Sequence, residues 1–453
     1  ESATSPATLA WLAPPVAAAK TFTVAVTATD LAGNSTPGSR TITVTPRSDT
    51  VPPTVVIDCP SAGALLPSGL SAFTLQATAG DDQGVRHAEV YRDAEATPFA
   101  TFFATNGATR SFPVSASGIA LPAVTEPTVV RFRVRAFDFG GNASGEVQTE
   151  VTVVPAVEVS ATGPNDWEAL SGQTAYVASG TTLVLDQPRT FRDLLVLHGA
   201  SITHLAGGNR RLDVTVTGSL FIECGGSIDV TGRGYPAGTT YAGATGSTNA
   251  AGSHLGVGGI GSGDTPSGTY GNVRQPQEAG SGGFGSHALA GGGVVRIQAG
   301  AIALGGPSAS IIANGSGGYR NVGAGGSVWI TAGSITGDGR IEAAGGGANY
   351  SRGGGGAIAI EYGSTSGTVL SRANAKGGGA GSGAQNGGAG TVVLKGPGAT
   401  HGTLRIDNLD TTGQQTVLPS LGSGTAQSGT AGATLVTDRS ATIPAYFAGH
   451  WVE

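Results

Sequence analysis

The sequence predicts an all-β chain in which a β-sandwich is followed by a right-handed parallel β-helix with long glycine-rich loops. Three observations lead to this prediction: stretches that alternate apolar and polar residues, a repeated unit of short strands, and 78 glycines among 453 residues. Many of the apolar residues are valine and isoleucine, with threonine beside them, and β-branched residues favour strands. Only 12% of the residues are charged, which argues against a disordered linker.

Charge and hydropathy exclude two classes of partner. The formal net charge is −6 and no block of basic residues occurs, so we expect no nucleic-acid surface. No apolar run approaches the roughly 20 residues of a membrane helix, so we expect no membrane span in this segment. The chain contains no methionine and begins without a charged leader, which suggests an internal piece of a longer precursor.

The two cysteines, Cys59 and Cys224, lie far apart in sequence and fall in different predicted domains. Neither has a partner at metal-ligand spacing. We therefore expect no metal site at these positions, and we expect no disulfide between them.

Two similar segments, residues 21–46 and 129–155, each predict a β-hairpin. Both alternate apolar and polar residues, turn on the pattern D-x-x-G-N, and then alternate again. The pattern aligns Asp30 with Asp138 and places an asparagine four residues after each. Aspartate and asparagine suit such a turn because their short side chains hydrogen-bond to nearby backbone.

These hairpins resemble the last two strands of the tandem bacterial Ig-like domains found in large secreted surface proteins. The segments "DTVPPTVVI" and "AGDDQGVRHAEVYRD" resemble the linker with first strand, and the middle strands, of such a domain. The resemblance implies a bacterial protein, secreted or on the cell surface. It also implies a whole sandwich at residues 49–156 and a partial domain, its last strands only, at residues 1–48.

The strands that the first copy lacks have two possible sources. The chain is cut from a tandem array, which we favour, or another subunit supplies the strands by β-strand addition. An isolated two-stranded hairpin is marginal in water, so one of the two is required.

Calcium is the one cofactor that the sequence suggests, with Asp81, Asp82 and Asp138 as weak candidate ligands. Calcium takes 6–8 oxygen ligands, and a single D-x-x-G-N aspartate offers one carboxylate. We therefore expect these aspartates to stabilise turns, and we expect no cofactor.

The second half repeats a unit of glycines and short strands. Val295, Val328, Ile358 and Val392 occupy corresponding places, at spacings of 33, 30 and 34 residues. A period of 20–50 residues indicates a solenoid, in which each coil buries its apolar face against the next. Three short strands per unit predict a parallel β-helix, which resembles the glycine-rich stalks of bacterial adhesins and fibres.

The predicted β-helix spans residues 157–410. Residues 235–290 lack strand alternation and are interpreted as a long insertion at the corner that carries the glycine-rich loops. Residues 411–453 are interpreted as a linker and the start of a further β domain. The glycine-rich loops themselves can lie side by side as extended segments, since glycine permits close backbone packing.

Catalysis receives little support from the sequence. Glycine-rich fragments do not occur between a strand and a helix, as a nucleotide site requires. Polysaccharide lyases and glycoside hydrolases with β-helix folds need clustered carboxylates, but acids here are sparse, and Asp338, Glu342 and Glu361 are the candidates. We expect the chain not to be an enzyme.

Binding residues recur in the loops after successive coils. Tyrosine, arginine and asparagine combine apolar faces with hydrogen-bonding groups, which suits sugars or a protein partner. The alternative is that these side chains only cover exposed glycine backbone. The candidates are Tyr319, Arg320, Asn321, Asn349, Tyr350, Arg352, Gln385 and Asn386.

The sequence as a whole favours an extracellular structural protein, a component of a cell-surface fibre or filament that assembles with itself. Two other functions stay open. One is a carbohydrate-binding adhesin that contacts surface polysaccharide through the tyrosine loops, and the other is a polysaccharide-degrading enzyme.

Overall fold

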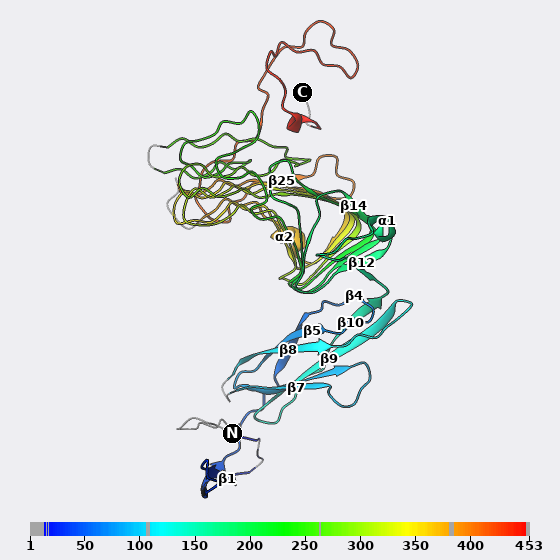
Figure 1. Cartoon of the computed structure of the whole chain (residues 1–453), viewed down its shortest axis with the longest axis vertical. Helices are drawn as coiled ribbons and strands as arrows, with labels where there is room; N and C mark the ends of the chain where they lie inside the picture. The colour runs from blue at the N-terminus through cyan, green and yellow to red at the C-terminus, as the bar shows by residue number, and fades with distance from the viewer. Residues whose placement is uncertain are drawn as a thin grey trace. The chain divides into compact units, whose positions relative to one another are not determined.

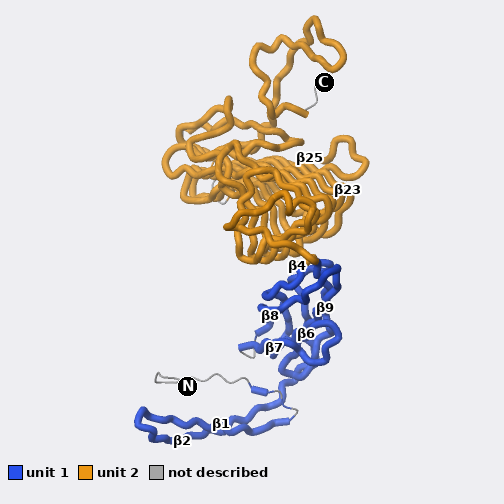
Figure 2. Tube along the Cα trace, turned by 45° about the vertical axis from the view of Figure 1, so that its right-hand side comes forward, with its two compact units in different colours: residues 1–64, 68–154 blue, residues 65–67, 155–453 orange. Residues whose placement is uncertain are grey.

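The computed structural model describes residues 13–14, 16, 18–105, 109–261, 264–379 and 385–449. It is all-β, and its helices are short, such as α1 (Trp167–Leu170) and α2 (Val369–Arg372) (Figure 1). The chain divides into two compact units, shown in Figure 2: unit 1 holds residues 1–64 and 68–154, and unit 2 holds residues 65–67 and 155–453. Within the described residues, no helix is long and apolar enough to cross a membrane.

Unit 1 begins with an antiparallel hairpin of β1 (Lys20–Thr29) and β2 (Ser35–Val44). Its turn is held by Asp30, whose carboxylate accepts hydrogen bonds from the backbone N–H groups of Ala32 and Asn34, both at 2.9 Å. These bonds and that of Asn34 Nδ2 lower the pKa of the Asp30 carboxyl. The side chain therefore stabilises the turn, as the sequence suggested.

Two antiparallel sheets follow and correspond to the predicted sandwich, and their strands belong to unit 1 except for the last three residues of β4. One has the strand order β3-β5-β8 and the other β4-β10-β9-β6-β7. They pack face to face, with the rings of Phe73 and Phe132 at 5.6 Å between centroids. The strands are β3 (Thr54–Cys59), β4 (Ala64–Pro67), β5 (Phe73–Gly80), β6 (Val85–Arg92), β7 (Ala100–Phe103), β8 (Ser111–Ile119), β9 (Thr128–Asp138) and β10 (Val147–Val154).

The larger sheet of unit 2 has the order β11-β12-β15-β17-β19-β21-β23-β24-β25, with β14 paired to β17. Its neighbouring strands run parallel, except that β25 is antiparallel to β24. The strands are β11 (Val157–Glu158), β12 (Thr174–Val177), β14 (Arg189–Phe191), β15 (Asp193–Val196), β17 (Leu212–Glu223), β19 (Val294–Gly305), β21 (Ser327–Gly337), β23 (Ala357–Ser366), β24 (Thr391–Lys395) and β25 (Thr403–Arg405).

A second sheet of unit 2 consists of strands of three residues in the order β13-β16-β18-β20-β22, all parallel. Each follows a strand of the larger sheet along the chain, so the chain alternates between the two sheets. The strands are β13 (Thr182–Val184), β16 (Ser201–Thr203), β18 (Ser227–Asp229), β20 (Ser310–Ile312) and β22 (Arg340–Glu342).

The predicted register of the repeat is confirmed. Val295 pairs with Val328, Val328 with Ile358, and Ile358 with Val392. Aliphatic side chains from both sheets form one buried cluster that runs through successive coils. This cluster is the shared apolar core that neighbouring repeats were expected to build.

Strand length differs from the expectation of three short strands per repeat. From β17 to β23, the strands of the larger sheet have 10 to 12 residues. Gly300, Gly333 and Gly363 lie inside these strands and stack on one another. A Cβ at Gly333 would lie 2.5 Å from the carbonyl oxygen of Gly300, and one at Gly363 would lie 2.6 Å from that of Gly333. Each long strand therefore pairs with its neighbours on both sides of the glycine, and the glycines themselves are not paired.

Glycine-rich segments form a second packed region, here called the glycine layer. Backbone hydrogen bonds of 2.8–3.0 Å join its neighbours, such as Gly292 N–H to Ala324 O, Gly325 N–H to Gly354 O, and Gly355 N–H to Gly388 O. In Figure 1 the segments are green to yellow traces outside the labelled strands. The glycine layer consists of residues 250–259, 291–293, 323–326, 353–356 and 387–390.

The segment predicted as an insertion contributes to this layer. Residues 250–259 are all buried. Gly256 N–H donates to Gly355 O at 3.0 Å, and Gly388 N–H donates to Val257 O at 2.8 Å. The structure thus differs from the expectation of a loop at a corner, because this segment is buried and bonds through its backbone to the glycine-rich segments of successive repeats.

The last part of unit 2, predicted as a linker and the start of a further β domain, has little regular structure among its described residues. Gln415 and Val417 hydrogen-bond to the glycine layer through their backbones. None of residues 418–449 is buried, and between residues 411 and 449 the structure has isolated bridges and one short helix, η2 (Ala445–Phe447), in place of named strands. The described residues there do not form a further β domain.

The two cysteines also depart from the expectation. Neither Cys59, the last residue of β3, nor Cys224, directly after β17, is a free thiol. The prediction that they lack a disulfide is therefore wrong. That expectation rested on the separation of the two residues along the chain and on their places in different predicted domains.

Replacing Gly353 with alanine is expected to destabilise unit 2, because the new Cβ would lie 1.9 Å from the carbonyl oxygen of Gly323. Overpacking of this kind costs about 1–3 kcal/mol, sometimes more. Gly347→Ala is the matched control, since no heavy atom lies within 4 Å of its added Cβ. Urea unfolding followed by the fluorescence of Trp167 and Trp329 measures both variants. Equal midpoints would contradict close backbone packing in the glycine layer.

Candidate binding surfaces and buried ionisable groups

Two of the predicted binding residues form an exposed aromatic row. Tyr319 is 52% exposed and Tyr350 is 46% exposed. Their rings lie edge to face with centroids 5.5 Å apart, and the ring of His287 lies 5.5 Å from Tyr319 on its other side. A parallel bridge between residues 318 and 348 holds the two loops in register. We call His287, Tyr319 and Tyr350 the tyrosine ladder.

The polar residues that follow Tyr319 hold its loop in place through hydrogen bonds. Asn321 is fully buried and has a positive φ of 51°. Its Nδ2 donates to Asn249 Oδ1 at 2.8 Å and to Ser286 O at 3.1 Å, and Arg320 Nη2 also donates to Asn249 Oδ1, at 3.2 Å. Asn321 therefore fixes the loop rather than facing a ligand.

Arg352 and Asn386 form a second internal pair. Both are 3% exposed, and Arg352 Nη1 donates to Asn386 Oδ1 at 3.0 Å. Arg352 Nη2 reaches Asn349 O at 3.0 Å, and the backbone N–H of Arg352 donates to Gln385 O at 2.9 Å. These polar groups join adjacent loops, whereas Tyr319, Tyr350 and Asn349 are the predicted residues that remain exposed.

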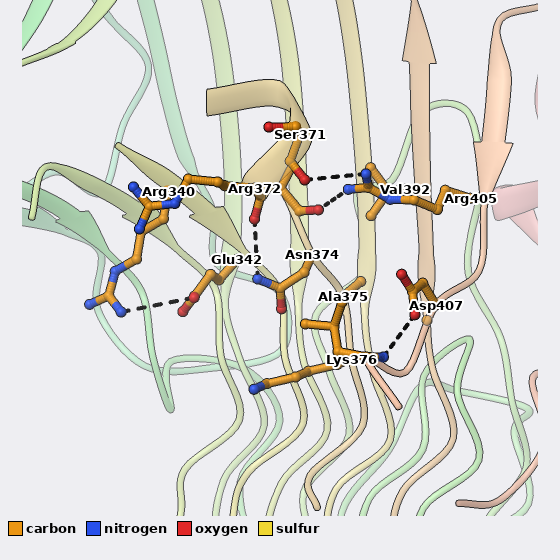
Figure 3. A pocket seen from close by; sticks show the side chains of 13 residues that line it. Arg340, Glu342, Ser371, Arg372, Asn374, Ala375, Lys376, Val392, Arg405 and Asp407 are labelled. Atoms are coloured by element: carbon orange, nitrogen blue, oxygen red, sulfur yellow. Dashed lines mark hydrogen bonds and ion pairs between the residues drawn. The ribbon is translucent and has the colours of Figure 1, made fainter. Parts of the chain in front are cut away.

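A groove that the sequence did not predict lies beside the last strand of the second sheet (Figure 3). Its volume is about 380 Å³. Four basic side chains and two acidic ones line it, which favours an anionic ligand. The lining residues fall between positions 340 and 409 and come from β22, α2, β24, β25 and the segments between them, so no local sequence pattern marks them. The charged lining residues are Arg340, Glu342, Arg372, Lys376, Arg405 and Asp407.

The three candidate catalytic acids each have a separate structural contact. Asp338 Oδ1 accepts hydrogen bonds from the N–H and hydroxyl of Thr368, both at 2.9 Å, at the start of α2. Glu342 accepts from Asn314 Nδ2 at 3.2 Å. The third, Glu361, forms an ion pair of 2.9 Å with Lys395 on the next strand.

The weak calcium candidates separate into two groups. Asp81 and Asp138 lie together with Asp49, which the sequence did not suggest, whereas Asp82 is exposed and is not part of that group. Asp49 was missed because it stands in the linker, far from the other two in sequence.

His254 is a fully buried histidine within the glycine layer. Its Nδ1–H donates to Gly325 O at 2.9 Å, and its ring lies 5.1 Å from that of Tyr270. Burial disfavours the imidazolium and lowers the pKa of His254 to about 4. Burial also raises the pKa of Tyr270, whose hydroxyl donates to Ala279 O at 2.7 Å.

Glu223, at the end of β17, is a buried acid whose pKa is raised, whereas the pKa of His254 is lowered. Burial raises the pKa of its carboxyl to about 7, and this effect outweighs the hydrogen bond from the backbone N–H of His198, which favours the charged form. At neutral pH this group is therefore close to its titration midpoint inside the protein.

Comparison with known proteins gives little guidance. No protein family matches the chain. No curated protein matches it either. One similar solved structure is described as "Structures of Clostridium thermocellum CbhA fibronectin(III)-like modules", with 18% sequence identity and a TM-score of 0.18. The match covers 31% of this chain and 65% of that chain, which is less than two thirds of its length. The architecture above rests on strand pairing and not on this similarity.

Two buried groups of unit 2, His254 and Glu223, are expected to contribute opposite pH dependences to its stability between about pH 4.5 and 6.5. The unfolded state binds the extra proton at His254, so stability falls as pH drops below 6.5 towards 4. The folded state binds the extra proton at Glu223, so stability falls as pH rises from 4.5 to 7. Each effect amounts to about 1.4 kcal/mol per pH unit.

Variants separate the two effects in urea unfolding at several pH values. His254→Asn keeps a donor for Gly325 O and is expected to make stability fall with rising pH. Glu223→Gln is expected to make stability fall with decreasing pH. Identical slopes in both variants would contradict this assignment, whatever the variants cost in absolute stability.

Proposed function

We propose that this chain is an extracellular structural protein and a component of a bacterial cell-surface fibre or filament. In this proposal the sandwich of unit 1 is an Ig-like spacer, and unit 2 is a right-handed parallel β-helix that serves as a stalk. Assembly occurs through β strands and glycine-rich surfaces.

The ladders of unit 2 support the β-helix part of the proposal. Parallel strands repeat in register from β12 to β24, and the chain alternates between two parallel sheets around one core. Crossover connections between parallel strands are right-handed in about 98% of cases, which favours the right-handed form. Such stacking distributes its hydrogen bonds along the whole ladder, which suits a stalk.

The hairpin β1–β2 is the observation that carries the assembly part of the proposal. Directly opposed residues share one face of an antiparallel pair, so Phe22, Val24, Val26 and Ile42 lie on one face. Val26 is 49% exposed and Ile42 is 39% exposed. The similar hairpin β9–β10 lies inside a five-stranded sheet, with strands on both sides.

An apolar face on a two-stranded sheet is not stable alone in water, so the hairpin requires a partner. We propose that strands of a neighbouring module or subunit cover it, which links successive copies. This contact is β-strand addition, in which backbone hydrogen bonds supply the affinity and apolar side chains the specificity.

Charge on the apolar face of the hairpin is expected to reduce assembly. Val26→Lys should shift the size distribution towards monomer in light scattering after gel filtration, because it places an unpaired charge in the contact. Thr27→Lys, on the opposite face, is the control and should leave the distribution unchanged. Native material that is strictly monomeric and dispersed in electron micrographs would refute the fibre proposal.

Carbohydrate binding is the second candidate, and the tyrosine ladder favours it. Two exposed rings in a row, held in register by their loops, offer stacking faces with hydroxyl groups at the rim. Surface polysaccharide is the ligand class that this surface would suit.

A glycan array tests this second candidate. Tyr350→Ala is expected to weaken any binding about tenfold, because it removes one ring from the ladder. Tyr350→Phe keeps the ring and should retain most of the binding. Binding that is equal in all three proteins would exclude the ladder as the site.

A further inference from the structure

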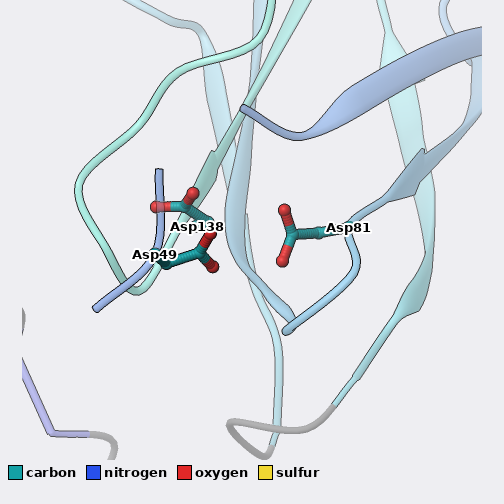
Figure 4. Close-up of side chains that lie close together, drawn as sticks. All are labelled: Asp49, Asp81 and Asp138. Atoms are coloured by element: carbon teal, nitrogen blue, oxygen red, sulfur yellow. The ribbon is translucent and has the colours of Figure 1, made fainter. Parts of the chain in front are cut away.

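We propose that unit 1 contains a calcium site formed by Asp49, Asp81 and Asp138. The three residues come from separate parts of the chain: Asp49 precedes β3, Asp81 directly follows β5, and Asp138 ends β9. Figure 4 shows the Asp81 carboxylate pointing towards the other two. This proposal does not depend on the function proposed above.

The spacing of the carboxylates fits calcium. One oxygen from each aspartate lies within 4.8 Å of the others. Calcium binds oxygen at about 2.3–2.6 Å, so two ligands on opposite sides of the ion are up to about 5 Å apart. Magnesium usually keeps several waters and is bound by one or two carboxylates, whereas calcium accepts several protein oxygens, so three carboxylates make calcium the better fit.

Burial makes these charges costly without a cation. Asp138 is fully buried and Asp49 is 7% exposed. Three carboxylates at this distance repel one another, and buried charges are normally paired or bound to a metal.

Two of the carboxylate oxygens have unused hydrogen-bonding capacity. Among the described atoms, Asp49 Oδ2 and Asp81 Oδ2 are shielded from solvent and have no hydrogen-bond partner. The other oxygens of the same groups accept backbone bonds, from Val51 N–H at 3.2 Å and from Gln83 N–H at 2.9 Å. An unsatisfied buried carboxylate oxygen is unfavourable, and a bound cation satisfies it.

The site is built by contacts that hold the linker against the end of the sandwich. Asn142 Nδ2 donates both to Asp138 Oδ2 at 2.7 Å and to Asp49 O at 2.9 Å. Gly140 permits this approach, because a Cβ there would lie 2.8 Å from both Cβ and O of Asp49. A calcium ion would add a further link between the linker and two loops of the sandwich.

The first hairpin supplies an internal comparison. Asp30 and Asn34 repeat the turn of Asp138 and Asn142, with the same backbone and side-chain hydrogen bonds. Asp30 is exposed, and in the described part of the chain it belongs to no cluster of carboxylates. The turn therefore forms by itself, and the cluster around Asp138 requires a separate explanation.

Calorimetry on the chelator-treated full chain tests the site. Titration with calcium chloride is expected to show saturable binding of one ion per chain at this site, and scanning calorimetry should show an upward shift of several degrees in the transition of unit 1. Magnesium at the same concentration should give a much smaller shift. Absence of saturable heat up to millimolar calcium, or an equal shift with magnesium, would overturn the proposal.

Asparagine variants separate metal binding from a structural role. Asp49→Asn and Asp81→Asn should lose most of the calcium-induced shift. In chelator both should be at least as stable as the unmodified chain, because each removes repulsion among carboxylates. Asp82→Asn and Asp30→Asn are the controls and should keep the full shift. Variants that are destabilised equally with and without calcium would show that the aspartates act only within the turn and would refute the site.

Discussion

The in-register parallel ladder of unit 2 is the constraint on which the rest of that unit depends. Once Val295, Val328, Ile358 and Val392 are paired, the aliphatic residues of each coil face those of the next. The same register brings glycine above glycine, so that the segments between strands approach closely enough to bond through their backbones. It also sets the loops that carry Tyr319 and Tyr350 one above the other. Core, glycine layer and exposed aromatic row are thus three results of a single alignment.

Different interactions stabilise the two units. The sandwich of unit 1 depends on interdigitating side chains such as Phe73 and Phe132, and on aspartate-asparagine turns at the strand ends. The glycine layer of unit 2 has almost no side chains to interdigitate, so it depends on backbone hydrogen bonds at short range. This layer includes His254, whose pKa lies far below its usual range because burial disfavours the imidazolium.

The sequence predicted the parts of this architecture that side chains encode. The period of valine and isoleucine placed four coils in the correct register, and the D-x-x-G-N pattern identified both hairpin turns. The path of residues 250–259 could not be predicted, because glycine has no side chain whose periodicity reports burial. Asp49 was missed because its partners are brought to it by tertiary folding. The loops near Tyr319 and Tyr350 were aligned correctly, yet the pattern could not tell that Asn321 and Arg352 point inward.

The close packing of glycine restricts how such a chain can change over evolutionary time. A Cβ at Gly323, Gly353, Gly387 or Gly390 would lie 1.9 Å from a backbone oxygen of another segment. Point mutations at these positions are therefore disfavoured one at a time. Duplicating or deleting a complete coil, in contrast, replaces one set of backbone contacts with an equivalent set. The number of repeats is thus freer to vary than the glycines packed within each repeat. Relatives of this chain should therefore differ by whole repeats.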